Sequence, residues 1–403
     1  MQKGREKSNL IYLYLLIGFE VIYWLITIVN SGQYFDTYFV RDYNDSGMDF
    51  YNMLALLDNE DPYIFKSNYP AMCFLILKIF WQMIPMQWRC ADGKALREFY
   101  FVNLEYHLLL IICAIAIWQI VASFTLEKRK KTILPTVVML SGPILFTIER
   151  GNLIMISFIF LLLFVRFYNS ESKWMRYVSY VCLAFSAAIK IYPAFFGILI
   201  LKEKRYKEAC LAVILGAFLF TAPFFFFDGI HSGGAMLRGM RAASEIQGNA
   251  GMGYNFSFIN LVKIIFAIGG SVINEIPGII IIIPILIVVF IYFTAQETWK
   301  KMFAISLVCI WIPTFSYTYM LILLIVPFLF FCNEIKTGIC IAIYRILYLI
   351  ILIPIALPSL ERLDFPEAQY PLSWSTVIIN MSIIFFVITL IVDNILQIIK
   401  KKI

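Results

Sequence analysis

Apolar stretches recur along almost the whole chain and are separated by short polar or charged breaks. This pattern predicts an all-α polytopic membrane protein rather than a soluble domain with a single anchor. Several stretches are shorter than the roughly 20 residues of a full crossing, which is tolerated where protein surrounds the helix backbone. We expect about twelve transmembrane helices, at 9–29, 99–125, 132–147, 153–168, 177–189, 191–201, 209–227, 277–295, 302–314, 318–332, 338–358 and 374–395.

Basic runs set the expected orientation of these helices. They occupy residues 127–131, 173–176 and 202–207, and further basic residues precede the first span and end the chain. Because Lys and Arg resist translocation across a membrane, we expect all of these runs, and both termini, on the cytoplasmic side.

Two long polar segments then face outward. The first, 30–98, is an external loop with juxtamembrane helices, and the second, 228–270, is an external loop with a re-entrant segment. Each contains a short apolar stretch, 69–86 or 257–270, whose full crossing would put basic residues outside, so we interpret both as re-entrant or interfacial. Residues 1–403 are therefore expected to form one integral domain of the cell membrane, with its polar chemistry on the outer face.

Composition supports this class and excludes others. Hydrophobic residues make up 61% of the 403 residues and the mean hydropathy is +0.82, whereas an ordinary soluble domain is about 45–50% apolar. The net charge of +7 is concentrated in the predicted cytoplasmic loops without forming a basic stripe, so we expect no nucleic-acid partner. The eight cysteines are scattered without a C-x-x-C pair or a His cluster, so we expect no zinc site, no disulfide framework and no cofactor.

Carboxylates are densest in the first external loop. Asp45, Asp49 and Asn52 are spaced i, i+4 and i+7, so a helix there would present them on one face. Met53, Leu54, Leu56 and Leu57 would form an apolar face suited to lying along the membrane surface. Two carboxylates beside a bilayer could supply a general base for a lipid-linked substrate. The alternative is a solvated acidic loop with an Asp N-cap.

Cations interrupt the apolar runs elsewhere. Arg150 and Lys190 each stand at a break between two expected spans. An ionisable group at such depth costs about 2.5–3.5 kcal/mol and usually lines a cavity or binds something, and a lipid phosphate would supply the anion. The alternatives are a lysine that snorkels to the interface and an internal pair of Arg150 with Glu149.

The second external loop adds weaker candidates. It contains Arg238 and Arg241 and is rich in Gly near its end, so it is either a mobile gate over a cavity or a solvated connector. A last polar break, Pro313 to Tyr319, is expected on the same outer face.

These breaks match, in order, the motifs of a known enzyme family. The matching residues are Asp45, Ala55-Leu56-Leu57, Asp61-Pro62-Tyr63, Tyr69-Pro70, Arg150-Gly151-Asn152, Lys190-Ile191-Tyr192-Pro193, Asn255-Phe256-Ser257 and, more loosely, Pro313 to Tyr319. In them the chain resembles glycosyltransferase family 87, membrane enzymes with the GT-C type of fold that resemble polyprenyl-phosphate-mannose-dependent mannosyltransferases. Asp49 stands where the family has a Tyr, so both Asp45 and Asp49 remain candidates for the base. Tyr319 stands where the family has a His, so this chain has no matching residue for any role that depends on that His.

The resemblance implies an inverting transfer of a hexose such as mannose from a polyprenyl-phosphate donor on the outer leaflet. The acceptor would be a glycan or glycolipid of the cell envelope, and the lipid bilayer would be the remaining partner. Asp45 or Asp49 would deprotonate the acceptor, without a metal. The expected ligands of the donor phosphate are Arg150, Lys190, Arg238 and Arg241, and the expected substrate contacts are Asn52, Tyr63, Tyr69, Asn152, Tyr192, Asn255, Ser257 and Tyr319.

Two other functions remain open from the sequence. Broken helices also suit a multi-spanning transporter, although no inverted repeat is visible and the polar residues gather outside rather than at the midplane. A glycan polymerase would act on similar lipid-linked substrates.

Overall fold

The computed structural model describes residues 2–35, 38–40, 43–59, 61–65, 67–248, 251–271, 273, 276–333, 338–357 and 372–402. Asp36 and Asn249, two polar residues of the expected external loops, lie outside these ranges. Within them the chain is helical, which confirms the all-α class. No strand occurs among the described residues, and an isolated antiparallel bridge pairs Asn255 with Tyr317.

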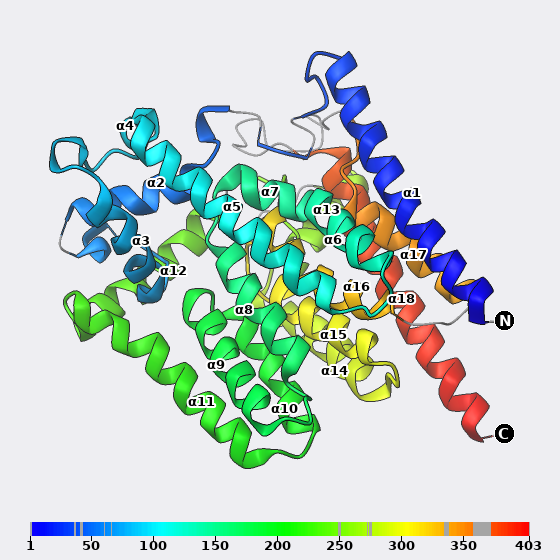
Figure 1. Ribbon diagram of the computed structural model, residues 1–403. Coiled ribbons are helices and arrows are strands. Elements are labelled where there is room, and N and C mark those ends of the chain that lie inside the picture. The colour runs from blue at the N-terminus through cyan, green and yellow to red at the C-terminus, as the bar shows by residue number, and fades with distance from the viewer. Residues whose placement is uncertain are drawn as a thin grey trace. The chain divides into compact units, whose positions relative to one another are not determined.

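The helices divide between two compact units. Unit 1 comprises Met1–Arg41, Val121–Phe146 and Gln247–Ile403, and unit 2 comprises Asp42–Ile120 and Thr147–Ile246. Helix α7 (Gly142–Arg150) runs from the first unit into the second, and α5 (Tyr100–Ser123) and α12 (Ile230–Gly248) of unit 2 each end two or three residues past its boundary. Figure 1 labels the α-helices.

The helices of unit 1 come from three separate parts of the chain. They are α1 (Gln2–Val29), α6 (Lys130–Leu140), α13 (Phe258–Ile268), α14 (Ile282–Thr294), α15 (Thr298–Trp311), α16 (Ile325–Phe331), α17 (Ile339–Leu352) and α18 (Trp374–Lys402), with 3-10 helices at Gly278–Ile281 and Thr318–Leu324.

Unit 2 holds most of the first segment that is expected to be external, together with a group of long helices. Its helices are α2 (Met48–Ala55), α3 (Ala71–Met83), α4 (Gly93–Glu98), α5 (Tyr100–Ser123), α8 (Ile154–Phe167), α9 (Lys173–Ile189), α10 (Ile198–Lys202), α11 (Tyr206–Thr221) and α12 (Ile230–Gly248). Its 3-10 helices are Tyr43–Asp45, Leu56–Asp58, Pro62–Phe65, Met86–Trp88, Tyr192–Gly197 and Ala222–Phe226. Helix α9 packs against both α8 and α11 (Figure 1).

Apolar length identifies this as a membrane protein. Among the described residues, 4 helices are long and apolar enough to cross a bilayer: Ser8–Val29, Tyr100–Ser123, Tyr206–Phe226 and Trp374–Lys401. The bent pair of α6 and α7 makes a fifth if it is counted as one span. Seven shorter apolar helices of 10–17 residues coincide with other expected spans or re-entrant segments. The count of about twelve spans stays a prediction.

The bend between α6 and α7 has a local cause. The two helix axes differ by 52°, and Ser141 between them has extended backbone angles. Gly142 and Pro143 follow. Pro143 lacks the N–H that a continuous helix would bond to the Met139 carbonyl, and its ring would clash with that carbonyl. Gly142 also has no room for a side chain, because an added Cβ would lie 2.5 Å from the Tyr38 hydroxyl oxygen.

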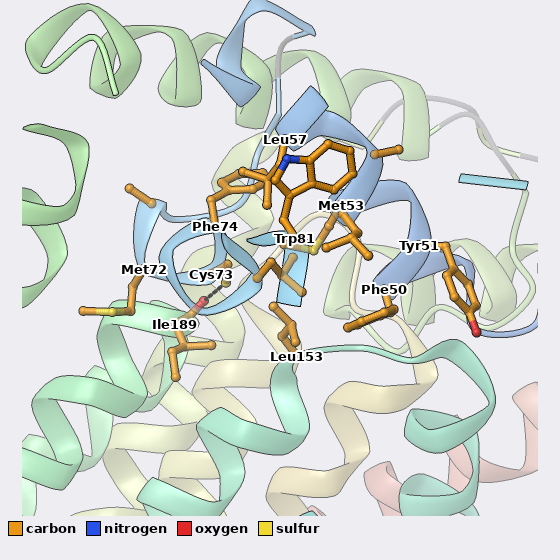
Figure 2. Close-up of a cluster of buried hydrophobic side chains, with 14 of the residues drawn as sticks. Phe50, Tyr51, Met53, Leu57, Met72, Cys73, Phe74, Trp81, Leu153 and Ile189 are labelled. Atoms are coloured by element: carbon orange, nitrogen blue, oxygen red, sulfur yellow. Dashed lines mark hydrogen bonds between the residues drawn. The ribbon is translucent and has the colours of Figure 1, made fainter. Parts of the chain in front are cut away.

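The apolar residues beside Asp49, in the first segment that is expected to be external, form a core rather than a membrane-facing surface. Met53, Leu54 and Leu57 are buried in a cluster that also contains residues of α3 and α9, and Leu56 packs against that cluster (Figure 2). The expectation that this face lies along the membrane was therefore wrong. Burying it against α3 removes it from contact with both water and lipid and fixes α2 to α3, which in turn packs against α9.

Candidate active site

A tight turn precedes α2 and positions the two acidic candidates. Asp45 ends a 3-10 helix, Ser46 and Gly47 form the turn, and Asp49 lies in the first turn of α2. Gly47 has φ +73, and an added Cβ would lie 2.9 Å from the Tyr51 ring, so only glycine fits there. The expectation of one helix that includes Asp45 was wrong, because α2 begins at Met48, after this turn.

A second glycine turn, after α7, packs against the first. Gly151 has φ +66, and an added Cβ would lie 3.0 Å from the Gly47 carbonyl oxygen and 3.0 Å from the Tyr106 ring. The last carbonyl groups of a helix lack partners within the helix. In α7 two of them accept from other segments, since the Tyr106 hydroxyl donates to the Ile148 carbonyl at 2.6 Å and the Gly47 N–H donates to the Glu149 carbonyl at 2.6 Å.

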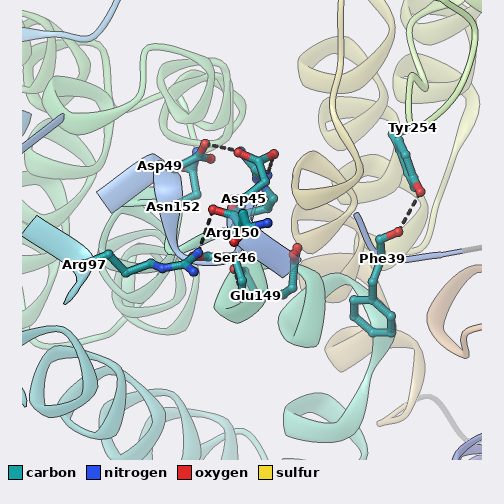
Figure 3. Close-up of polar contacts among 10 residues, drawn as sticks. Phe39, Asp45, Ser46, Asp49, Arg97, Glu149, Arg150, Asn152 and Tyr254 are labelled. Atoms are coloured by element: carbon teal, nitrogen blue, oxygen red, sulfur yellow. Dashed lines mark hydrogen bonds and ion pairs between the residues drawn. The ribbon is translucent and has the colours of Figure 1, made fainter. Parts of the chain in front are cut away.

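Arg150, at the end of α7, joins both carboxylates (Figure 3). Its Nη1 donates to Asp45 Oδ2 and, at 3.3 Å, to the Asp45 backbone carbonyl. Its Nη2 donates to Asp49 Oδ1 at 2.8 Å. The partners lie 105 and 101 positions away in the sequence. The Arg150 side chain is 8% exposed, so these charge-assisted bonds lie in a poorly solvated setting.

The two carboxylates differ in how firmly they are held. Asp49 uses both oxygens, because its Oδ2 accepts from Asn152 Nδ2 at 2.7 Å, and its side chain is 16% exposed. Asp45 is 33% exposed, and among the described residues only Arg150 donates to its carboxylate. Asp45 therefore offers an accessible oxygen, whereas Asp49 is fixed between Arg150 and Asn152.

Lys190 lies close to this centre. Its Nζ is 4.3 Å from the centroid of the Tyr69 ring, a cation–π contact, and the Tyr69 hydroxyl is 3.4 Å from Asn152 Nδ2. Burial lowers the pKa of Lys190, while the charges of Cys73 and Asp49 act to raise it. Lys190, Tyr69, Asn152 and the two aspartates thus form one polar site within unit 2.

Other residues expected at the site have different positions in unit 2. Tyr63 is buried, and its hydroxyl donates to the Tyr69 carbonyl at 2.9 Å, so it supports Tyr69. Asn52 is exposed on α2 next to α4, where an added Cβ at Gly93 would lie 2.4 Å from Asn52 Oδ1. Tyr192 is half-buried at the start of a 3-10 helix.

The two arginines of α12 are not buried in the protein. Arg238 and Arg241 are both exposed. Arg241 pairs at 3.3 Å with Glu245, one turn further along the same helix, rather than with a residue of the aspartate turn. Their expected place beside the donor phosphate therefore stays a prediction.

Three expected substrate contacts lie in unit 1. Asn255 Oδ1 accepts from the Ser257 N–H at 3.0 Å and the Ser316 N–H at 2.9 Å. Ser257 Oγ donates to the Thr314 carbonyl at 3.0 Å and caps α13. These two side chains join the start of α13 to the polar break at 313–319, and the ring of half-buried Tyr319 lies 5.4 Å from that of Tyr317.

Arg97 is a contributor that sequence reasoning missed. From the last turn of α4 it donates to the Asn44 carbonyl at 2.6 Å and the Ser46 carbonyl at 3.4 Å, which holds the turn that carries Asp45. A single arginine in a charged surface helix gives no sequence signal of this role. As for metals, the described residues contain no group of three or more His, Cys, Asp or Glu side chains arranged to hold an ion.

Comparison with known proteins identifies the family. No curated protein and no solved structure matches the chain significantly. The family model of glycosyltransferase family 87 matches residues 83–327, more than half of the 403 residues. This range contains Arg150, Asn152 and Lys190, and the turn with Asp45 and Asp49 precedes it. The chain therefore belongs to glycosyltransferase family 87 and is a membrane glycosyltransferase.

Proposed function

We propose that this enzyme transfers a hexose such as mannose, with inversion, from a polyprenyl-phosphate donor to a glycan or glycolipid acceptor at the outer membrane face. The observation that carries the proposal is the pairing of Asp45 and Asp49 on Arg150, beside Lys190. This site combines a carboxylate that can act as a base with two cations, Arg150 and Lys190, that suit a phosphate. Family membership favours this reaction over transport.

Asp45 is the proposed base. It is the more exposed carboxylate, and among the described residues its Oδ1 accepts no hydrogen bond. An oxygen that no donor occupies is accessible to the acceptor's hydroxyl hydrogen. Asp49 positions Arg150 instead, since Asn152 and Arg150 occupy its two oxygens.

Lys190 and Arg150 are the proposed stabilisers of the leaving phosphate. Negative charge grows on the phosphate as its bond to the sugar breaks, and fixed cations lower such a barrier most effectively. A phosphate leaving group needs no protonation, so one carboxylate suffices, unlike the two that a glycoside hydrolase uses. Arg238 and Arg241 are weaker candidates because they are exposed.

The proposed topology has about twelve spans of a GT-C fold, cytoplasmic termini and an external site. Its support is the position of the basic runs next to helix starts: Lys130 begins α6, Lys173 begins α9 and Tyr206, after a basic run, begins α11. All three starts would be cytoplasmic under the bias of Lys and Arg against translocation.

Transfer from a purified polyprenyl-phosphate hexose by the purified protein in detergent tests the reaction. Asp45→Asn should reduce the rate by roughly 10²–10⁴-fold, the usual contribution of a general base. Asp58→Asn removes the same charge from an exposed position of the same segment and serves as the control. Transfer by Asp45→Asn at the rate of the control would exclude Asp45 as the base.

A further inference from the structure

Arg150 holds two carboxylates, but it holds them unequally. Asp49 is tied a second time by Asn152 and belongs to the packed helix α2. The Asp45 side chain has one ion-pair partner among the described residues, and it is twice as exposed, at 33% against 16%. If an anion competes for Arg150, displacing the Asp45 carboxylate costs less free energy than displacing the Asp49 carboxylate.

The four ionisable side chains proposed to act on the substrates balance in charge before any substrate binds. Asp45 and Asp49 contribute two negative charges, and Arg150 and Lys190 contribute two positive ones. A sugar phosphodiester adds a negative charge to this group. The departing phosphate monoester carries about −1.5 to −2 at pH 7, so the demand for cations increases during the reaction.

We propose that Arg150 exchanges partners during the reaction: it pairs with Asp45 in the resting enzyme and moves to the donor phosphate, which releases the Asp45 carboxylate to act as the base. This inference rests on the proposed function, whose base and phosphate ligands it connects. It explains how one arginine can be both a partner of the base and a phosphate ligand. Donor binding then precedes activation of the acceptor.

The bond changes fit this exchange. The acceptor O–H proton passes to Asp45 as the acceptor oxygen bonds to the anomeric carbon. The bond from that carbon to the phosphate oxygen breaks, and its electron pair stays on the phosphate. Asp45 therefore loses its charge as the phosphate gains one, and Arg150, already paired with the phosphate, lies beside the group on which negative charge builds up.

The backbone around Asp45 allows its side chain to leave while the turn stays in place. The turn is held by backbone contacts, from Gly47 N–H to the Glu149 carbonyl and from Arg97 to the Asn44 and Ser46 carbonyls. None of these bonds uses the Asp45 carboxylate. A change of side-chain rotamer is thus sufficient for the exchange.

Binding of farnesyl phosphate to the full-length protein in detergent, measured by calorimetry, tests the exchange without turnover. Asp45→Asn removes the competing carboxylate and should bind the probe roughly tenfold more tightly than the wild type, a change of about 1.4 kcal/mol. Asp49→Asn should gain less, because Asn152 already shares that carboxylate with Arg150. Asp58→Asn should bind like the wild type, and farnesol, which lacks the phosphate, should distinguish none of the variants.

Two results would overturn the exchange. One is equal affinity of Asp45→Asn and Asp58→Asn for farnesyl phosphate, and the other is an equal gain in Asp45→Asn and Asp49→Asn, which would indicate simple charge repulsion. The melting temperature of each variant identifies unfolded protein. Loss of transfer in Asp45→Asn without a gain in affinity would reject the exchange and leave the proposed function standing, and retained transfer would reject the proposed function.

Discussion

Gly151→Ala should damage both the stability and the activity of the enzyme. Gly151 has φ +66, and its added Cβ would meet Gly47 and Tyr106 at 3.0 Å and Phe50 at 3.1 Å. The left-handed backbone costs an alanine about 1–2 kcal/mol, and crowding a packed contact costs roughly 1–3 kcal/mol, which together give about 2–5 kcal/mol. Because one of the contacted atoms, the Gly47 carbonyl oxygen, belongs to the turn that carries Asp45, relief of the clash should also separate Arg150 from that turn.

The matched control is Gly216→Ala. Gly216 lies within α11 with nothing within 4 Å of an added Cβ, so the substitution should be neutral or stabilise the helix by about 0.5–1 kcal/mol. Thermal unfolding in detergent measures stability, and transfer from a polyprenyl-phosphate hexose measures activity. A displacement of about 1 Å at a catalytic group can reduce a rate about 10²-fold, so we expect a loss of that order in Gly151→Ala. A melting temperature and rate equal to those of Gly216→Ala would refute the packing argument.

The remaining predictions concern Lys190, its neighbour Tyr69 and the topology. Tyr69→Leu should weaken donor binding by up to about 2 kcal/mol because Lys190 loses its cation–π partner, whereas Tyr69→Phe should keep most of that affinity; equal losses would contradict the role of the ring. Lys190→Met should weaken donor binding without lowering the melting temperature. In the wild type, donor affinity should fall as the pH rises, at a pH below that at which an exposed lysine loses its proton, because burial lowers the pKa of Lys190. The same pH dependence in Lys190→Met would show that another group titrates. Lys204→Cys in a Cys-free background should resist an impermeant thiol reagent in intact cells, and labelling would reverse the topology.

The sequence alone determined the helical class and the approximate place of most helices. The expected span 153–168 corresponds to α8 (Ile154–Phe167), and 99–125 corresponds to α5 (Tyr100–Ser123). This correspondence arises because a bilayer offers no hydrogen bonds to the backbone, so apolar length and polar breaks decide where helices can run. For the same reason, the charged residues Arg150 and Lys190 stand out as candidates from their position at breaks in the apolar pattern.

Only the tertiary structure decided what those candidates touch. The i, i+4 spacing of Asp45 and Asp49 suggested one helical face, yet Gly47 separates them and Arg150, more than 100 positions away, brings them together. Likewise the leucines beside them bury against α3 and α9, and Tyr63 supports Tyr69 from the core. Local pattern sets secondary structure through backbone and solvent energetics. Contacts between distant segments depend instead on how whole helices pack, because that packing alone selects which carboxylate meets which cation.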